Sequence, residues 1–398
     1  MAQALTHQML AREAVAMLVE NNPIIRNVNT RRKKEFGEEV NGYKKGDSVR
    51  IKVPPVPTVY DGSQFAGGGA APSHQETELS LTLDTQKHVP LTFTAKEKLL
   101  ELTEYRERFL KPAMNSLGAI INADLLERMK NQTPNVVGTW GTVPNSRTTY
   151  RTAASTLDRF LAPGDNRSVH FSSDANDALA EANATLFHSR SEIEAEFDKN
   201  AVGMFAEMTF YKQQSISVHT NGAGAGYLVN GASQAGSGLI VDTGTGAIPK
   251  GSIIVIAGVD SVHPLTGQTN GKPRQFRVTA DYAGGAGTIQ ISPAIVANSA
   301  TVRGNVTALP ADNAAITVFG TASTSARQNL AFHRDAFAAA FAPLPVLASC
   351  EGYTASIDGI SVRVMTFGDG KEDLEHTRVD VLYGETVVRE DHAVRITE

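Results

Sequence analysis

Glycine-rich stretches are the first candidates for chemistry in this sequence, because closely spaced glycines can cradle a phosphate group. Gly222, Gly224 and Gly226 lie in "TNGAGAG", and Gly244 and Gly246 lie in "GTGAIPKG". The second stretch lacks the Gly-Lys-Ser/Thr ending of a phosphate-binding loop. None of these glycines leads from a predicted strand into a predicted helix. The spacing therefore favours linker glycines over a nucleotide site.

Histidine is the next candidate, since the chain has ten of them. They do not form a His-Glu-x-x-His pair or another spacing typical of a metal site. The scattered positions include His74, His88, His170, His188, His219, His263, His333, His376 and His392. Glu375-His376 lies in the acidic stretch "DGKEDLEH", which is typical of a solvated loop. We therefore predict no metal site from local motifs. The alternative of a metal site assembled from histidines and carboxylates distant in the sequence is left open.

Nucleophilic catalysis needs an activated serine or cysteine. The only cysteine, Cys350, follows an apolar run with helical character, and we expect a small buried hydrophobic side chain there. Ser361 follows Gly359-Ile360 without the Gly-x-Ser-x-Gly frame of a nucleophile elbow. We therefore predict no catalytic residue, no cofactor and no enzymatic activity.

Composition narrows the class of protein further. The 398 residues carry a net charge of -5, and the mean hydropathy is -0.19. An acidic chain is a poor binder of nucleic acid over a broad surface, and glutamates follow the one basic run, 31–34, at once. A single cysteine excludes a disulfide framework. No signal peptide is recognisable and the apolar runs are too short for a membrane span, so we expect a cytosolic product without a membrane partner.

Two stretches have the spacing of amphipathic helices. Residues 3–20 place Leu10, Ala14, Met17 and Leu18 on one face. A capping box at residues 94–97 opens a shorter helix through Leu102, and a long helix then runs from Pro112 to about residue 131. The apolar stripe of the long helix is Met114, Leu117, Ile121, Leu125 and Met129, which we expect in the core.

Residues 46–94 contain two alternating stretches separated by a Pro/Gly/Ser-rich loop. The apolar positions are Val49, Ile51 and Val53 in the first stretch and Leu79, Leu81, Leu83, Val89, Leu91 and Phe93 in the second. The polar positions between the first three are Ser48, Arg50 and Lys52. At about 3.3 Å per residue the second stretch predicts one strand of roughly 46 Å, and a lone hairpin is marginal in water. Another part of the chain or a neighbouring subunit must cover the apolar row, and its length favours the neighbour.

The remaining chain alternates between mixed and all-β segments. Residues 151–222 predict helices around Leu157 and Leu179, strands at 167–171 and after Gly203, and a helix cap at Ser173-Asp174. Residues 222–328 predict an inserted barrel or sandwich. Its short strands are predicted at 238–242, 252–257, 274–280, 287–292 and 314–319. The aromatic residues of this insertion are spread over its strands, and we expect them to lie in its core. A helix is predicted at 329–342, followed by strands to the end of the chain.

Several segments together resemble the major capsid (coat) protein of tailed bacteriophages, and most closely the coat-protein family of the short-tailed Salmonella phages. They are "GDSVRIKVP" (46–54), "LTLDTQKHVPLTFTAKEKLLEL" (81–102), "LAPGDNRSVHF" (161–171), "GMFAEMTFYKQQSISVHTNG" (203–222), "KGSIIVIAGVDSVHP" (250–264), "NLAFHRDAFAAAFAPL" (329–344), "DGISVRVMTFGD" and "TRVDVLYGETVVREDHAVRI" (358–397). They span nearly the whole chain in the same order as in that family.

The resemblance implies the α+β Hong Kong-97-type phage capsid fold with a small all-β, barrel-like insertion. The implied parts are an N-terminal arm (1–45), an extended two-stranded loop (46–94), a peripheral domain with a spine helix (95–150), the first part of an axial domain (151–221), the inserted β-domain (222–328) and the C-terminal axial and peripheral part (329–398). The extended loop would contact an adjacent subunit through Val49, Arg50, Ile51, Lys52, Val53, Leu79, Leu81 and Leu83.

The function that the resemblance implies is an icosahedral phage head enclosing double-stranded DNA. Hexamers and pentamers of the chain would form a procapsid around a scaffolding protein in the cytoplasm of the host bacterium. A portal protein would admit the DNA, without sequence-specific contact to the shell, and the shell would expand into the virion capsid. A decoration protein is left open. The alternative is another virion or adhesion protein whose β insertion binds a ligand or glycan.

Overall fold

The computed structural model describes residues 6–30, 48–53, 63, 77–94, 106–184, 203–299, 303–369 and 374–398. The chain divides into two compact units. Unit 1 is Met1–Ile51, Glu78–Leu125 and Phe337–Val388, and unit 2 is Lys52–Thr77, Leu126–Ala336 and Arg389–Glu398. Helices and sheets occur in both, which confirms the predicted α+β class.

The helical elements are α1 (His7–Asn21), α2 (Pro23–Asn27), the π-helical turn η4 (Arg106–Leu110), α4 (Lys111–Gln132), α5 (Arg147–Arg159), α6 (Ser173–Ala184), and the short 3-10 turns η5 (Arg334–Ala336) and η6 (Glu390–His392). The strands are β1 (Ser48–Val53), β2 (Thr77–Thr82), β3 (Thr85–Thr94), β4 (Asn135–Val137), β5 (Arg167–Phe171), β6 (Met204–Phe205), β7 (Met208–Lys212), β8 (Val218–Thr220), β9 (Leu228–Val229), β10 (Gly236–Asp242), β11 (Ile253–Val262), β12 (Thr269–Val278), β13 (Gly287–Ile295), β14 (Ile316–Val318), β15 (Ser325–His333), β16 (Phe337–Ala342), β17 (Glu351–Ile357), β18 (Ile360–Asp369), β19 (Leu374–Val387) and β20 (Ala393–Thr397).

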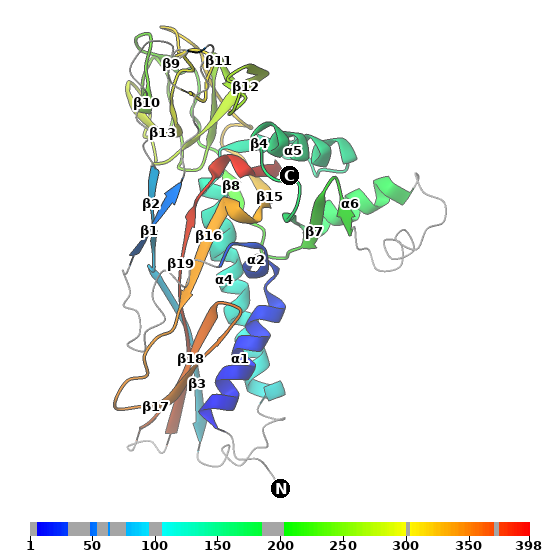
Figure 1. The fold of residues 1–398 in the computed structure, drawn as a ribbon, viewed down its shortest axis with the longest axis vertical. Helices are drawn as coiled ribbons and strands as arrows, with labels where there is room; N and C mark the ends of the chain where they lie inside the picture. The colour runs from blue at the N-terminus through cyan, green and yellow to red at the C-terminus, as the bar shows by residue number, and fades with distance from the viewer. Residues whose placement is uncertain are drawn as a thin grey trace. The chain divides into compact units, whose positions relative to one another are not determined.

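Strand β19 is the centre of unit 1. It pairs with β18 and β3 along its first part and with β16 along its last part, so one long strand holds three partners (Figure 1). Strand β17 pairs with β18 and completes the sheet. Val379 and Val381 of β19 are both fully buried. The sheet therefore contributes β19 side chains to the core of this unit.

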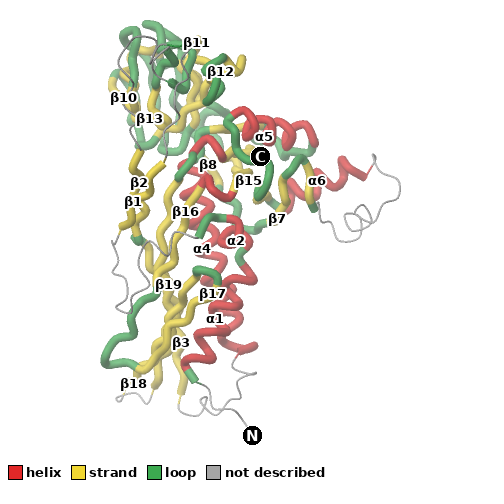
Figure 2. The backbone as a smooth tube through the Cα atoms, viewed as in Figure 1, coloured by secondary structure: helices red, strands yellow, loops and turns green. Residues whose placement is uncertain are grey.

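Helix α1 covers strands β17 and β18 (Figure 2). Thr6 caps its N-terminus, where the hydroxyl accepts a hydrogen bond from the Met9 amide at 3.4 Å. The four residues predicted to share one apolar face are all buried. The burial of this face confirms the amphipathic helix read from the sequence.

Helix α4 matches the long predicted helix closely, since it spans Lys111–Gln132. All five residues of the predicted apolar stripe are at most 1% exposed. At Gly118 a Cβ atom would lie 2.7 Å from the side-chain amide nitrogen of Asn22, so glycine lets the junction between α1 and α2 approach α4 closely. Among the described residues, no helix combines the length and the apolar character that crossing a membrane requires.

The predicted single strand over residues 79–93 is wrong, because the chain changes partner at Leu83-Asp84. Strand β2 ends at Thr82 and pairs with β1, whereas β3 begins at Thr85 and pairs with β19. The chain passes β19 at Gly384, where a Cβ atom would collide with the Thr82 carbonyl. The alternating pattern runs through both strands and therefore hides the break between them.

Unit 2 is built on a seven-stranded mixed sheet in the order β4-β20-β15-β5-β7-β6, with β8 also paired to β15. Helices α5 and α6 pack on it through a core that includes Tyr150, Leu157 and Leu179. The predicted helix near Leu179 is confirmed, but its cap is Ser172, whose hydroxyl accepts from the Ala175 amide at 3.0 Å. The strand predicted at 167–171 is confirmed as β5.

An inserted β-module, residues 222–324, interrupts this sheet between β8 and β15. Its six strands follow the order β14-β11-β12-β13-β10-β9, and all five predicted strand segments are among them. The strands enclose an apolar core of their own, which includes Tyr227 and Phe276, both predicted to be core aromatics. Strand β15 begins at Ser325, so residues 325–328 belong to the seven-stranded sheet and not to the module.

The helix predicted at 329–342 is wrong. Strand β15 and strand β16 occupy this segment, with the single turn η5 between them. Every residue of β16, "FAAAFA", is buried. Burial on both faces removes the apolar/polar alternation that reveals a strand, and tertiary pairing overrides the helix propensity of alanine.

Four predicted features lie outside the described residues. They are the basic run 31–34, most of the loop 54–76, the helix opening at 95–102, and the helix end before Gly203.

Candidate assembly surfaces and buried polar sites

The β1–β2 hairpin carries the predicted subunit contact residues. In β1 the apolar side chains at 49, 51 and 53 are half-buried or buried, whereas Ser48, Arg50 and Lys52 are exposed. Glu78 and Ser80 continue the exposed row on β2. The alternation read from the sequence is therefore confirmed in each strand, and the hairpin has an inner apolar face and an outer polar face.

The inner face is covered by the chain itself. Ile51, Leu81 and Leu83 are 0% exposed and pack against Leu382 and the alanines of β16. The expectation that a neighbouring subunit covers these three residues is wrong, because strands distant in the sequence already do so. Val49, Val53 and Leu79 are only half-buried and keep apolar surface available.

The outer face is polar and carries positive charge. The Arg50 side chain is 79% exposed, and its Nη1 lies 3.3 Å from Oε2 of Glu78 across the hairpin. Exposed ion pairs of this kind contribute little to stability, typically about 0–1 kcal/mol. With Lys52 beside it, this face has more cationic than anionic groups. The outer face is therefore better suited to contact another protein surface than to stabilise the hairpin.

A buried carboxylate joins three strands of unit 1. Asp380 of β19 is 0% exposed. Its Oδ2 accepts hydrogen bonds from Nε and Nη2 of Arg363 at 3.3 and 2.9 Å. Its Oδ1 accepts from Nε of Arg378 at 2.7 Å and from Nε2 of Gln86 at 3.1 Å. This network could not be predicted from the sequence, because its members are far apart along the chain and only the stretch "TRVDVLY" contains two of them.

The buried histidines are structural. His170 is fully buried between the rings of Tyr211 and Phe332, with centroid distances of 5.3 and 5.4 Å. Burial lowers the pKa of His170 to about 3, and burial, followed by the nearby Arg395 and Lys130, lowers the pKa of His219 to about 3. Both imidazoles are neutral near pH 7. In the described part of the chain, no three His, Cys, Asp or Glu side chains gather as metal ligands.

Cys350 differs from its predicted environment. It lies in the turn after residues 343–348 and before β17, and it is half-buried. Its sulfur lies 3.8 Å from the Ser349 hydroxyl. The apolar run before it forms no helix, so the sequence pattern gave the wrong local structure.

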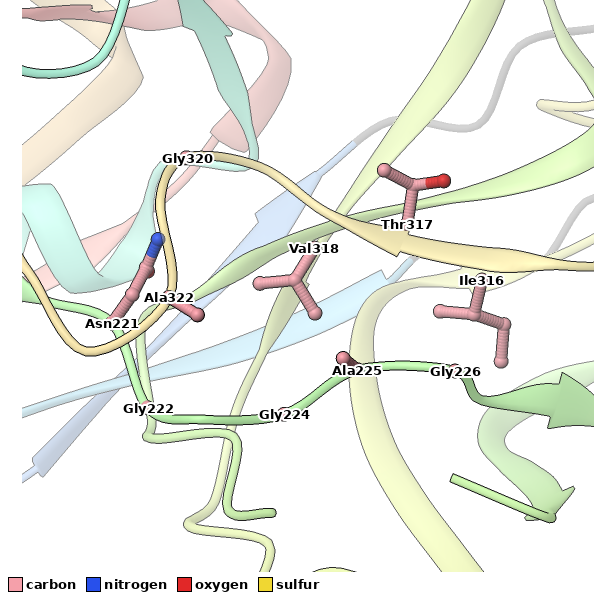
Figure 3. A pocket seen from close by; sticks show the side chains of 10 residues that line it. All are labelled: Asn221, Gly222, Gly224, Ala225, Gly226, Ile316, Thr317, Val318, Gly320 and Ala322. Atoms are coloured by element: carbon pink, nitrogen blue, oxygen red, sulfur yellow. The ribbon is translucent and has the colours of Figure 1, made fainter. Parts of the chain in front are cut away.

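The glycines that imitate a nucleotide loop form the base of the inserted module. The amide of Gly224 donates to the Ala247 carbonyl at 3.0 Å, and a Cβ atom at Gly244 would collide with the Tyr227 ring. A cavity of about 340 Å³ lies beside them (Figure 3). Its lining has no charged side chain, and its polar side chains are those of Asn221 and Thr317. These glycines therefore serve close packing within the module instead of acting as the flexible linker that the sequence predicted, and their surroundings offer no counter-charge for a phosphate.

Comparison with known proteins decides the family. The family model described as P22 coat protein, gene protein 5, matches residues 44–396. The chain belongs to the P22 coat protein family. A comparison with curated proteins gives no match.

Solved structures similar to this coat protein come from phage capsids. A chain of Mycobacterium phage Che8 is 12% identical with a TM-score of 0.50, and the match covers 94% of this chain and 90% of that chain. The mature capsid of bacteriophage PhiM1 is 9% identical with a TM-score of 0.42, covering 90% and 88%. The CUS-3 coat protein I-domain is 27% identical with a TM-score of 0.19, covering 24% and 95%.

The likeness to the Che8 chain over nearly the whole length confirms the predicted Hong Kong-97-type capsid fold. Membership of the P22 coat protein family identifies the chain as a major capsid protein that forms the phage head. Coat proteins of this kind assemble into a multimeric icosahedral shell, so the chain is a structural component of the virion.

Proposed function

We propose that this coat protein assembles as hexamers and pentamers around a scaffolding protein in the cytoplasm of the host bacterium. The procapsid then receives double-stranded DNA through a portal protein and expands into the mature head. The net charge of -5 supports a shell wall that leaves the DNA free to enter and leave. No enzymatic step is part of this proposal.

In this proposal the domain roles follow the family resemblance. Residues 1–45 form an arm, 46–94 an extended loop, and 95–150 a peripheral domain with α4 as its spine helix. Residues 151–221 form the first part of the axial domain, and the inserted module then interrupts it. Residues 329–398 complete both the axial domain and the peripheral domain.

The observation that carries the proposal is the two-sided β1–β2 hairpin. Its inner face is fixed on its own unit through Ile51, Leu81 and Leu83, so the hairpin is a rigid platform. Its outer face presents Arg50 and Lys52, and the half-buried Val49, Val53 and Leu79 lie along the hairpin. Many weak contacts of this kind, repeated by closed symmetry, hold a shell together without a tight dimer. We infer that the outer face contacts an acidic surface of the adjacent subunit.

Co-expression with the scaffolding protein, followed by negative-stain microscopy, tests the proposal. The wild-type chain is expected to yield closed shells. The double variant R50E/K52E is expected to remain folded by circular dichroism and to lose most shells, because two cations facing the neighbour become anions. Fewer shells with normal folding would assign the effect to contact between subunits.

A charge swap provides the matched control. The variant R50E/E78R keeps an ion pair across the hairpin but moves the positive charge to the other strand. If only the intact pair matters, the swap restores shells, and the outer face then has no contact role. Assembly of R50E/K52E at wild-type yield would also refute that role. Absence of shells for the wild-type chain with scaffold present would instead refute scaffold-assisted assembly itself.

A further inference from the structure

The inserted β-module is connected to the seven-stranded sheet by two adjacent chain crossings. The amide of Asn221 donates to the Thr324 carbonyl at 2.9 Å, and the amide of Ser323 donates to the Gly222 carbonyl at 3.1 Å. The module's apolar core contains only residues of the module itself. The contacts that fold the module are therefore distinct from the contacts that dock it. The apolar core stabilises the module itself, and other contacts fix it against the seven-stranded sheet.

An acidic turn makes the strongest of these contacts. Asp391 accepts a hydrogen bond from Nη2 of Arg274 at 2.7 Å. Glu390 accepts from the Ser292 hydroxyl at 2.8 Å and from Nε of Arg277 at 3.3 Å. Both carboxylates belong to η6, directly before β20, whereas their three partners lie on β12 and β13 of the module.

Two side chains beside this turn extend the junction. The amide group of Gln275 accepts from the Val136 amide at 2.8 Å and donates to the Val136 carbonyl at 3.0 Å, which completes the free edge of strand β4. Nη1 of Arg395 donates to the Gly251 carbonyl at 2.7 Å. Every one of these contacts is polar, and polar interfaces between folded parts permit relative motion more readily than apolar ones.

The junction also contains buried charged groups whose lost hydration is only partly compensated. Arg274 is 1% exposed, yet its Nε and Nη1 have no hydrogen-bond partner among the described residues. Its guanidinium carbon lies 4.8 Å from the centre of the Phe160 ring, which compensates part of the lost hydration. Burial, and then the neighbouring Asp391, raise the pKa of Glu390 above its ordinary value. A buried cation with unused donors beside a desolvated carboxylate is costly to leave unpaired, so removing one partner destabilises the others.

We propose that Glu390 and Asp391 form a releasable latch, which fixes the inserted module against the seven-stranded sheet and whose loss frees the module as a folded body on two linkers. The latch acts within one subunit and does not depend on scaffold-assisted assembly. Its release would let the module change orientation while both sheets keep their structure, a hinge movement in which the linkers absorb the change.

The single tryptophan reports on the docked state. Trp140 follows β4, and its indole Nε1 donates to the Thr324 hydroxyl at 2.8 Å. Its ring packs edge-on against Phe319 and His219, with centroid distances of 6.4 and 6.2 Å. Phe319 and Thr324 lie in the return linker of the module, so release would expose the indole to solvent.

The test uses the unassembled full-length chain with the double variant E390Q/D391N, which keeps side-chain size and removes both charges. Glu181 of α6 is exposed, and E181Q is the control for loss of a surface charge. Acrylamide quenching of Trp140 and limited digestion by elastase, which cuts after alanine, are the readouts. Ala322, in the return linker, is the site to observe.

For E390Q/D391N we expect the quenching constant to rise about two-fold, in line with local release of a folded part. We also expect faster cutting in the linkers, a surviving module fragment and unchanged circular dichroism, while E181Q behaves as wild type. Wild-type quenching and cutting would overturn the latch. Degradation of the module together with the rest of the unit would overturn its separability. If the double variant does not fold, D391N alone is measured and judged by the same outcomes.

Discussion

Truncation of Leu81 to alanine tests whether the β1–β2 hairpin is covered within the subunit. Leu81 is 0% exposed in a cluster with Ile51, Leu83, Leu382 and the alanines of β16. Burial within the single chain means that the cost of truncation appears in the isolated subunit. Covering by a neighbour would place the cost in assembly alone.

The size of the effect follows from the environment of the side chain. A leucine with no exposed surface, packed against Leu382 and the alanines of β16, leaves a cavity when it is shortened, and such changes cost about 2–5 kcal/mol. The alanines opposite Leu81 are too small to move into the space, so we expect the upper half of this range. The same change at the half-buried Leu79 is expected to cost about half as much or less, since part of its surface already meets water.

The assay is urea unfolding of the full chain below its assembly concentration, followed by circular dichroism. L81A is expected to lower the midpoint markedly, L79A moderately, and the exposed control S80A hardly at all. A stability of L81A equal to that of S80A, combined with failure to form shells, would refute the reasoning and restore the neighbour as the cover.

Two further predictions concern buried charge. D380N removes the carboxylate that Arg363 and Arg378 share. Because the buried Arg363 is then left unpaired, we expect the free energy of unfolding, measured with urea, to fall by about 3–5 kcal/mol. A fall below about 1 kcal/mol would contradict the network. Because the pKa of buried His170 and His219 falls from 6.5 to about 3, the unfolded chain binds more protons between these values, and stability is lost as pH falls through that window. Each histidine contributes on the order of 5 kcal/mol over the full window, so H170N should flatten the profile of unfolding midpoint against pH, and an unchanged slope would contradict the assignment.

The periodic parts of the fold could be predicted from the sequence. Helices α1 and α4 have apolar stripes of helical spacing, and every residue of those stripes is buried. The strands of the inserted module are short, alternating and separated by turn residues, and all five predicted segments are strands. In each case the local pattern and the tertiary environment agree, and such agreement makes local inference reliable.

The other parts depend on partners that a local pattern does not contain. Strand β16 is alanine-rich and buried on both faces, so neither alternation nor propensity identifies it. The break at Leu83-Asp84 is set by Gly384 about three hundred positions later, which lets the chain cross β19. The outer face of the hairpin could be predicted from alternation, whereas the cover of its inner face and the Asp380 network required the folded structure.

The place of β20 in its sheet constrains the order in which the subunit can be completed during translation. Strand β20 lies between β4 and β15, so the seven-stranded sheet stays split until residues 393–397 leave the ribosome. All strands of the inserted module come from one continuous stretch, residues 228–318, and are available earlier. At about 5–20 residues per second, several seconds separate the two events. During that interval the nascent chain carries a finished module beside the unpaired edges of β4 and β15, and both edges stay open to wrong pairing until β20 arrives.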